Sequence, residues 1–474
     1  MAAQTPDTTG AQFLSSLADA SPRSLWLDDA SAPEPAPALV GEVRCDLLVV
    51  GGGFTGLWTA LQAKEDDPSL DVVVLEAREV GWAASGRNGG FVSSSLTHGL
   101  INGVERFPED METLERMGHE NLDGIEDALT RYGIDADWER NGELTVAYEP
   151  WQMEHIKAMP ELGERYGATV EVWDAERIQS EVASPTYVGA AYEAEGTALV
   201  NPAKLTWGLR RACIDLGVRL FERTPVTGLS EESGRMVATT AYGRVQAAKV
   251  ALGTNVFPNL VKRARAYVVP VWDYVLTTEP LTADQRASIG WKQRQGIGDS
   301  ANQFHYYRLT ADDRILWGGY DAIYYFGNGM DSRHEHRPET YAKLAEHFFT
   351  TFPQLEGVRF SHAWGGAIDT CTRFCAFWGQ AYGGKVAYVG GYTGLGVGAT
   401  RFGARVLLDL LSGKPTPRTE LDFVRRKPLP FPPEPVKFAG IQLTRWSIDR
   451  ADRHEGRRNP WLRTLDRMGL GFDS

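Results

Sequence analysis

The stretch that decides the fold is Leu47-Leu48-Val49-Val50-Gly51-Gly52-Gly53-Phe54-Thr55-Gly56-Leu57-Trp58. An apolar run enters the pattern Gly-x-Gly-x-x-Gly, and residues 58–64 can continue as a helix. A second apolar run, residues 72–75, ends in Glu76, about 20 residues beyond the last glycine. This order of strand, glycine turn, helix, strand and acid is typical of a dinucleotide-binding βαβ unit.

Each glycine of the motif has a physical role in such a unit. Gly51 permits the tight turn, Gly53 lets backbone amides approach a pyrophosphate, and Gly56 allows close packing of helix and strand. The anion lies at the helix N-terminus, and the acid accepts hydrogen bonds from a ribose diol. The residues expected to contact the dinucleotide here are Gly51, Gly53, Phe54, Thr55, Gly56, Glu76, Ala77 and Arg78.

Two further glycine-rich segments are expected at the same ligand. One is the loop 84–91, with the sequence ASGRNGGF, and the other is 390–398, which follows an apolar strand at 386–389 and precedes an amphipathic helix at 399–411. A second dinucleotide site is the competing interpretation, but no strand ending in an acid follows 390–398. The spacing favours one extended cofactor contacted by Ser85, Gly86, Arg87, Asn88, Gly89, Gly90, Gly391, Tyr392, Gly394 and Gly396.

Together these segments resemble a known family. DLLVVGGGFTGLWTA, the ASGRNGGF loop, residues 200–205 and 250–255, and GGYTGLGVG are similar to the D-amino acid oxidase-like superfamily of FAD-dependent oxidoreductases. The GRNGG loop, the run 306–310 and Gly318-Gly319 are most similar to the gamma-glutamylputrescine oxidase branch. The resemblance covers residues 25–411.

The resemblance implies an α/β fold of the glutathione reductase and D-amino acid oxidase type. A discontinuous Rossmann-like FAD-binding domain is expected over 43–105, 196–265 and 358–412, and an antiparallel-sheet substrate domain over 106–195 and 266–357. The FAD contacts then also include Val226, Gly253, Thr254 and Trp364. Some relatives attach their flavin through a cysteine, but Ala367 occupies that place here, so FAD is expected to be noncovalent.

The periodicity of the remaining chain agrees with this division. Alternating apolar residues at 268–278 and 315–325 predict antiparallel strands, and 109–133 and 340–349 predict amphipathic helices. Residues 1–42 form a Pro- and Ala-rich N-terminal extension in which Ser24-Leu25-Trp26-Leu27 is expected to dock on the body of the protein. The Pro- and Arg-rich tail, 413–474, is either a segment that docks on an acidic face or a solvated helix balanced by its own acids, with Trp446 and Trp461 as possible anchors.

Composition excludes several classes of function. The net charge is -13, which does not fit a nucleic-acid surface or attraction to anionic lipid. No apolar run reaches the roughly 20 residues of a membrane helix, and residues 1–10 lack the features of a signal peptide. We therefore expect a soluble cytoplasmic protein, with its oligomeric state open.

The four cysteines lack CxxC spacing, so no metal site is expected. Cys371 and Cys375 remain a conceivable redox pair, although residues 364–379 have the pattern of strand and loop.

The resemblance also directs attention to an arginine of the second domain. Amino-acid-oxidising relatives hold the substrate carboxylate with an arginine in the strand before Gly318-Gly319. Thr310 occupies that place here, and Arg308 lies two residues earlier, on the same face of a strand. Arg308 is therefore expected to reach an acid group of the substrate, while the departure at Thr310 counts against an α-carboxylate pocket.

Aromatic and histidine residues supply the other candidates. Aromatic rings are dense between residues 272 and 325, where they either form sheet core or hold an ammonium group by cation–π attraction, worth about 0.5 to 2 kcal/mol. Tyr306 and Trp272 are the candidates for substrate contact, and Tyr392 is expected beside the flavin. His98 is expected to orient the substrate, accept a proton or pair with backbone. Arg87 either stabilises the reduced flavin or supports its loop.

These features predict an FAD-dependent amine oxidoreductase. In the implied reaction a hydride passes from the carbon beside nitrogen to flavin N5, water hydrolyses the imine, and molecular oxygen reoxidises the flavin. The alternatives are a D-amino acid or N-methylamino acid dehydrogenase that passes electrons to a carrier, and a flavoprotein without turnover. The partner in every catalytic version is a small-molecule amine or amino acid.

Overall fold

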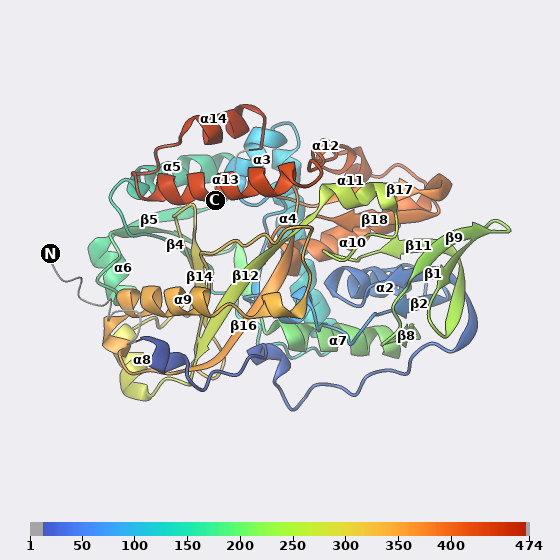
Figure 1. The fold of residues 1–474 in the computed structure, drawn as a ribbon, viewed down its shortest axis with the longest axis horizontal. Coiled ribbons are helices and arrows are strands. Elements are labelled where there is room, and N and C mark those ends of the chain that lie inside the picture. The colour runs from blue at the N-terminus through green and yellow to red at the C-terminus, as the bar shows by residue number, and fades with distance from the viewer. Residues whose placement is uncertain (1–12, 471–474) are drawn as a thin grey trace.

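The computed structural model describes residues 13–470, and two sheets organise it (Figure 1). The first sheet has the strand order β17-β18-β11-β1-β2-β8. All neighbours along this path are parallel except β17 and β18. Its strands are β1 (Gly41–Val50), β2 (Val72–Leu75), β8 (Arg219–Phe221), β11 (Gly243–Leu252), β17 (Phe377–Ala381) and β18 (Val386–Gly390). A hairpin, β9 (Gly228–Glu232) and β10 (Arg235–Thr239), joins β11.

The apolar run of β1 is continuous because both of its faces are buried. Leu47 and Val49 belong to one hydrophobic cluster, whereas Leu48 and Val50 belong to another on the opposite face. Helix α2 contacts both other helices of the first domain, so the three cover one face of the sheet together. They are α2 (Phe54–Asp66), α7 (Pro202–Asp215) and α10 (Gly396–Ser412). This arrangement confirms the Rossmann-like domain.

The second sheet has the order β16-β12-β15-β14-β13-β4-β6-β5 and is antiparallel except between β13 and β4. The antiparallel strands expected at 268–278 and 315–325 are present as β12 and β15, which pair with each other, although β15 ends at Gly319. The strands are β4 (Glu143–Ala147), β5 (Val170–Asp174), β6 (Gly189–Glu193), β12 (Val269–Thr278), β13 (Gly296–Asp299), β14 (His305–Leu309), β15 (Ile315–Gly319) and β16 (Phe360–Thr370). A short third sheet pairs β3 (Phe91–Ser93) with β7 (Thr197–Leu199).

Two elements lie on the other side of the expected domain boundary. Strand β16 pairs with β12 along its length, so the start of the segment 358–412 belongs to the second sheet. Helix α4 (Met111–Arg131) packs on α10, and its apolar side joins the cluster of the first domain. The other helices are α3 (Leu100–Arg106), α5 (Gln152–Arg165), α6 (Ala175–Glu181), α8 (Ala283–Ile289), α9 (Pro338–Thr351), α11 (Pro417–Glu420) and α12 (Asp422–Arg425).

The N-terminal extension docks as predicted. Trp26 is buried, and its indole Nε1 donates a 2.8 Å hydrogen bond to the carbonyl oxygen of Asn88. The Ser24 hydroxyl donates to the carbonyl oxygen of Gly86 at 2.9 Å. The extension therefore supports the glycine-rich loop 84–91 from outside. The first ten residues, on which the expectation about a signal peptide rests, lie outside the described residues.

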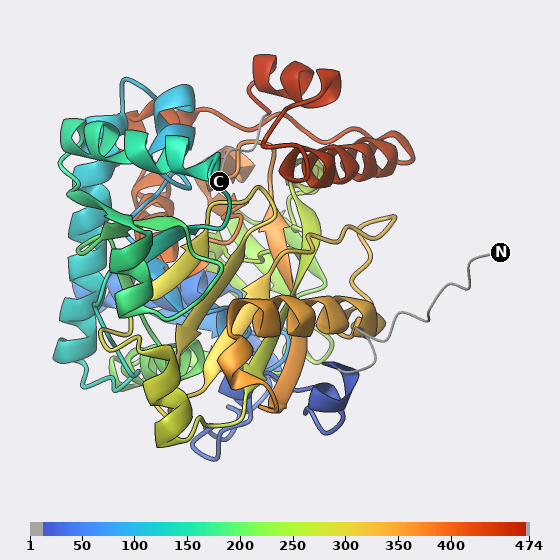
Figure 2. The same cartoon turned by 90° about the vertical axis from the view of Figure 1, so that its left-hand side faces the viewer.

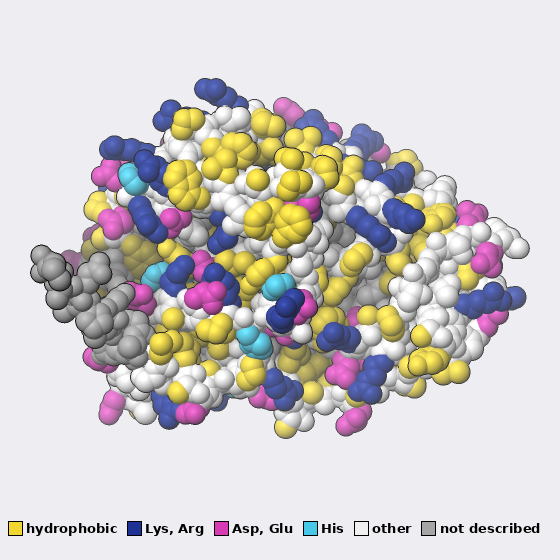
Figure 3. Space-filling view, in the orientation of Figure 1, with side chains coloured by type: hydrophobic (Ala, Val, Ile, Leu, Met, Phe, Trp, Pro, Cys, Tyr) yellow, Lys and Arg dark blue, Asp and Glu magenta, His cyan; other side chains and the backbone are white. Residues whose placement is uncertain are grey.

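The C-terminal tail forms α13 (Val436–Asp452) and α14 (Pro460–Arg467), on the same side of the molecule as α3 and α5 (Figures 1 and 2). Arg453 pairs with Asp449 at 2.9 Å and Arg458 with Asp466 at 2.6 Å, so acids of the tail balance its arginines. Figure 3 shows hydrophobic side chains gathered over this segment. Trp446 is 56% exposed, so it does not anchor the tail to the rest of the protein.

Within residues 13–470, no helix combines the length and apolar character that membrane crossing requires.

Candidate functional site

A cavity of about 1770 Å³ separates the two domains and is lined by all three glycine-rich segments and by the second sheet. This volume exceeds the roughly 300–1,000 Å³ that is usual for a pocket that binds one small ligand. It suits an extended dinucleotide together with a substrate.

The first glycine motif borders the cavity at the N-terminus of α2. Gly51 has φ +110°, and a Cβ atom there would lie 2.5 Å from the carbonyl oxygen of Gly253, so only glycine fits the turn. A Cβ atom at Gly56 would collide with the carbonyl oxygen of Gly51. Gly56 therefore serves the close packing of helix and strand. The backbone of Phe54 and Thr55, at the start of α2, lines the cavity where an anion is favoured.

Glu76 lies at the end of β2, as predicted, and lines the cavity. One carboxylate oxygen accepts from the backbone N–H of Gly52 at 2.6 Å, and the other accepts from Arg78 N at 2.9 Å and Trp82 Nε1 at 3.0 Å. Burial raises the pKa of Glu76, and these donors oppose that rise. These bonds fix the carboxylate at the position where the sequence predicts a ribose contact.

Buried polar atoms without partners identify the cavity as a site for a polar ligand. Thr254 Oγ1, Asn255 Oδ1 and Thr400 Oγ1 are buried and have no hydrogen-bond partner among residues 13–470. All three residues line the cavity. Such groups are normally satisfied in a folded protein, so these three atoms are available to hydrogen-bond a polar molecule in the cavity. Together with Glu76 and the two helix N-termini, they fit the FAD that the sequence predicts.

The C-terminal glycine motif meets the first motif across the cavity. Thr55 Oγ1 donates a 3.2 Å hydrogen bond to the Tyr392 hydroxyl, and Gly394 and Gly396 line the cavity at the start of α10. Asp369 accepts from the backbone N–H groups of Gly391 at 2.7 Å and Tyr392 at 3.2 Å. The competing idea of a second dinucleotide site is therefore wrong, because both motifs face one cavity.

Arg87 holds the flavin loop in place. Its Nε donates to the carbonyl oxygen of Trp82 at 2.9 Å, and its Nη1 contacts Glu335 at 2.7 Å and the carbonyl oxygen of Gly365 at 3.2 Å. The supporting role is thus present in the structure. A direct role toward reduced flavin stays a prediction, since Arg87 also lines the cavity.

Most predicted cofactor contacts line the cavity. They are Gly51, Gly53, Phe54, Thr55, Glu76, Ala77, Arg78, Ser85, Arg87, Asn88, Gly89, Val226, Gly253, Thr254, Tyr392, Gly394 and Gly396. Gly56, Gly86, Gly90, Gly391 and Trp364 are not among its lining residues. Trp364 instead donates from Nε1 to the carbonyl oxygen of Arg87 at 2.9 Å, and Gly391 packs on Cys371. These five residues therefore lie next to the lining residues without reaching the cavity themselves.

The second sheet presents one face to the cavity. Tyr306 and Asp273 lie on this face, and the Tyr306 hydroxyl donates a 2.6 Å hydrogen bond to the Asp273 carboxylate. Burial raises the pKa of Asp273 to about 6, while the hydrogen bond from Tyr306 lowers it. Tyr306 therefore faces the cavity, and its contact with substrate stays a prediction. Asp273 was missed, although a lone acid inside the apolar strand Val269–Thr278 is a signal for it.

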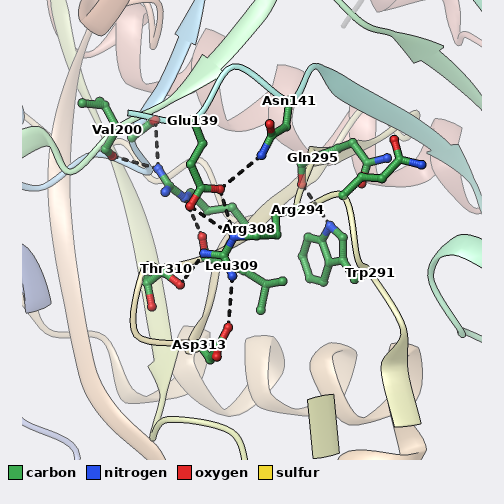
Figure 4. Close-up of polar contacts among 12 residues, drawn as sticks. Glu139, Asn141, Val200, Trp291, Arg294, Gln295, Arg308, Leu309, Thr310 and Asp313 are labelled. Carbon is green, nitrogen blue, oxygen red and sulfur yellow. Dashed lines mark hydrogen bonds and ion pairs between the residues drawn. The ribbon is translucent and has the colours of Figure 1, made fainter. Parts of the chain in front are cut away.

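Arg308 does not line the cavity, which corrects the expected contact with substrate. Its side chain is buried, and its guanidinium donates to the carbonyl oxygens of Val200 at 2.8 Å, Leu309 at 3.1 Å (Figure 4) and Gly90 at 3.2 Å. The residue shares a strand face with Tyr306, but the loop at Gly90 covers it. Thr310 is also buried and pairs with Asp312 at 2.6 Å.

Trp272 is a second correction. Neighbouring residues of a strand point to opposite faces, so the cavity position of Asp273 turns Trp272 away. The indole packs in the core of the second domain against Tyr325 and His334, and its Nε1 donates to the carbonyl oxygen of Gly329 at 3.0 Å. Trp272 is thus part of the core of the second sheet and does not contact the substrate. Core packing was the other interpretation given for the aromatic residues between 272 and 325.

His98 lines the cavity close to the C-terminal glycine motif. Burial lowers its pKa, and hydrogen bonding with the backbone at Thr393 opposes that shift. The imidazole is therefore neutral near pH 7 and has the chemistry of a proton acceptor. Its backbone has φ 64°, a left-handed conformation that is uncommon outside glycine.

The cysteines do not form a redox pair in this structure. Cys371 and Cys375 are free and buried, and the Cys371 thiol donates to the carbonyl oxygens of Cys375 at 3.2 Å and Gly391 at 3.4 Å. Burial raises the pKa of both thiols. Ala367, which the resemblance predicts at the place of a flavin-linking cysteine, lines the cavity. No group of three His, Cys, Asp or Glu residues between 13 and 470 is arranged to hold a metal ion.

Two parts of the cavity lining were not predicted from the sequence: the C-terminal tail and a set of glutamates. Arg445 of α13 lines it, with its Nε buried and unpaired among the described residues. Asp452 anchors the same helix, accepting from the backbone N–H groups of Asn302 at 3.1 Å and Gln303 at 3.0 Å. The glutamates that line the cavity away from the cofactor motifs are Glu115, Glu143 and Glu193.

Comparison with known proteins agrees with this geometry. The family model of FAD-dependent oxidoreductases of the DAO type matches residues 46–410. The chain is 35% identical over 400 residues to gamma-glutamylputrescine oxidoreductase of Escherichia coli, covering 82% of this chain and 89% of that protein. It is 29% identical over 399 residues to the probable oxidoreductase OrdL of Haemophilus influenzae, covering 82% and 88%.

Solved structures share the fold at lower identity. Glycine oxidase from Geobacillus kaustophilus superposes with a TM-score of 0.66 at 17% identity, covering 81% of this chain and 99% of that one. L-proline dehydrogenase from P. horikoshii superposes with a TM-score of 0.64 at 17% identity, covering 81% and 96%. The chain therefore belongs to the DAO family of FAD-dependent oxidoreductases.

Proposed function

We propose that this enzyme oxidises the C–N bond of a primary or secondary amine that lacks an α-carboxylate. The observation that supports this most is the charge of the cavity face of the second sheet. Within the described residues, the strands of that sheet contribute no arginine or lysine to the lining, and the acid that faces the cavity beside Tyr306 is Asp273. Carboxylates attract an ammonium group and repel a substrate carboxylate. The two positions at which an α-carboxylate clamp was considered, Arg308 and Thr310, are both buried outside the cavity.

The side chains at the cavity suit the preparation of an amine for oxidation. An amine must lose its ammonium proton before the adjacent carbon can be oxidised, and bound FAD supplies the two-electron acceptor. Asp273 is ionised above a pH of about 6 and can accept that proton or hold the ammonium group. Neutral His98 can do the same from the opposite domain. Tyr306 positions the Asp273 carboxylate.

The relatives support the same substrate class. The E. coli relative, 35% identical to this chain, is named for gamma-glutamylputrescine, which has a primary amine without a neighbouring carboxylate at one end and a glutamyl carboxylate at the other. We propose molecular oxygen as the acceptor that restores FAD. A D-amino acid or N-methylamino acid dehydrogenase is the competing function, since more distant relatives include sarcosine oxidase subunit beta of Rhodobacter capsulatus at 23% identity.

An anaerobic screen tests this proposal. Purified holoenzyme is mixed without oxygen with amines, D-amino acids and sarcosine, and bleaching of the flavin absorbance is recorded. Amines should bleach the flavin fastest, and hydrogen peroxide should form with the same compounds in air. Faster bleaching by sarcosine or a D-amino acid would contradict the proposed substrate class. Bleaching without peroxide formation in air would favour a dehydrogenase, and no bleaching by any compound would favour a protein without turnover.

A further inference from the structure

The glutamates away from the cofactor motifs form a group that amine oxidation at the flavin does not explain. Glu143 of β4 and Glu193 of β6 lie directly opposite each other on antiparallel strands. Like charges in this arrangement destabilise a sheet, so the pair has a cost that a bound cation would offset. Glu143 accepts one hydrogen bond, from the Thr197 hydroxyl at 2.8 Å. Glu193 has no side-chain hydrogen bond or ion pair among residues 13–470, and both residues line the cavity.

Glu115 provides a second observation from a separate element. It belongs to α4, is only 8% exposed, and lines the same cavity. Across the described part of the chain, no side chain or backbone group donates a hydrogen bond to its carboxylate. A buried carboxylate without a donor is costly, and such groups are normally paired. Glu115 is therefore a polar group directed into a cavity and lacking its partner.

Glu143 and Glu193 lie opposite each other on paired strands, and the charge of Glu193 also acts on Glu115. Burial and the charge of Glu193 raise the pKa of Glu115 to about 7, and burial and the charge of Glu143 raise the pKa of Glu193 to about 7. The acids therefore lie close enough to repel one another when ionised. A cation bound between them would remove this repulsion and favour the ionised forms.

The chemistry of the surroundings selects an organic cation. Met159, Val170 and Ala191 line the cavity and belong to an apolar cluster between α5 and the strands β5 and β6. Apolar walls of this kind suit methylene groups. The three glutamates are also not arranged as ligands of one metal ion. Carboxylates beside an apolar wall fit an ammonium group at the end of an alkyl chain.

We propose that Glu115, Glu143 and Glu193 form a second cation-binding subsite that holds an unreacting ammonium group at the far end of the substrate. The preferred substrate is then an α,ω-diamine or a longer polyamine rather than a simple monoamine. This inference rests on the proposed oxidation of amines, because it assigns one nitrogen to the reaction and the other to the subsite.

Matched pairs of amines test the subsite in the wild-type holoenzyme. Putrescine is compared with butylamine, and cadaverine with pentylamine, by stopped-flow reduction of the flavin without oxygen. Each diamine should bind at least about tenfold more tightly than its monoamine, the scale of one charge-assisted contact, with similar limiting reduction rates. Equal apparent Kd values within both pairs would overturn the subsite while leaving amine oxidation standing.

Charge-removing variants locate the effect. Glu115→Gln and Glu193→Gln keep the side-chain shape, and each should reduce the preference for diamines at least about fivefold without weakening monoamine binding. Glu195→Gln is the matched control, since Glu195 is exposed, raises the pKa of Glu193 through its charge, and does not line the cavity. The control should keep the wild-type preference. An unchanged preference in both subsite variants, or a loss of equal size in the control, would refute the assignment.

A probe that cannot be oxidised to an imine separates binding from turnover. Hexamethonium carries two quaternary ammonium groups, and its binding to the holoenzyme is measured by calorimetry against hexyltrimethylammonium. Hexamethonium should bind more tightly to wild type, and Glu193→Gln should remove the difference at unchanged FAD content and Tm. If no amine reduced the flavin but this difference remained, the proposed reaction would be wrong and the subsite right. If amines reduced the flavin and the difference were absent, the subsite would be wrong.

Discussion

The Tyr306 hydroxyl donates a 2.6 Å hydrogen bond to the carboxylate of Asp273, and both side chains face the cavity between the two domains. Strand β15 lies between the strands that carry them, and Gly318 leaves the space that the Tyr306 ring occupies. The contact places an acid of raised pKa, with a fixed orientation, where an amine substrate is expected.

Replacing Tyr306 by Phe should move the pH dependence of flavin reduction. The hydrogen bond lowers the pKa of Asp273, so its loss raises that pKa above about 6. Because the ionised carboxylate is the reactive form in our proposal, the acidic limb of the rate profile should shift to higher pH. Stopped-flow reduction across pH 5 to 9 measures it. Tyr307→Phe, on the opposite face and bonded to Tyr187, is the control; an identical shift in both variants would exclude a specific role for Tyr306.

His98 is predicted to act on the substrate rather than on the cofactor. His98→Ala should leave FAD content intact and slow anaerobic flavin reduction by about 10²-fold, the scale for a positioned acid–base group. His98→Asn is the better-matched variant, since asparagine tolerates the positive φ at this position. A structural histidine would instead lower Tm and flavin occupancy together. An unchanged reduction rate in FAD-replete variant protein would remove His98 from the reaction.

Arg308 is predicted to support the flavin loop. Arg308→Gln leaves the carbonyl oxygens of Gly90 and Val200 short of donors, which should weaken FAD binding by about 1–3 kcal/mol and lower Tm. KM for amines in the FAD-replete variant should not change. Arg294→Gln is the comparison, because Arg294 pairs with Glu139 and Asp313 and does not touch the loop. A selective rise in KM for acid-bearing substrates would restore the contact with substrate that the sequence predicted.

FAD is predicted to be noncovalent. Ala367, predicted from the resemblance to occupy the attachment position, lines the cavity, and the buried Cys371 thiol, with its raised pKa, is a poor nucleophile. Acid precipitation of the holoenzyme should release all flavin into the supernatant, measured by its absorbance. Flavin that stays with the precipitated protein would contradict this prediction.

The parts of the site that depend on local sequence could be predicted well. Strand β2 has the predicted bounds Val72–Leu75, and Glu76 lies at its end because a parallel strand and its following acid are encoded in neighbouring residues. The glycine motifs were found for the same reason. Each of them requires a backbone geometry or a close approach that other residues do not permit.

The failures arise from long-range packing. Both faces of β12 are buried, so its hydrophobic pattern does not reveal that Asp273 rather than Trp272 faces the cavity. Arg308 has the predicted strand face, but the loop at Gly90 covers it, and that coverage depends on residues more than two hundred positions away. The three glutamates come from α4, β4 and β6, whose pairing and packing cannot be read from their separate sequences.

The most direct test of the account compares cadaverine with lysine, since the two differ only by the α-carboxylate. Anaerobic stopped-flow mixing with holoenzyme gives the rate constant of flavin reduction for cadaverine, D-lysine and L-lysine under one condition. We expect reduction by cadaverine to be at least about 10²-fold faster at equal concentration, because the cavity face of the second sheet carries Asp273 and no arginine or lysine, so it binds an ammonium group and repels a carboxylate. Equal or faster reduction by either form of lysine would contradict it.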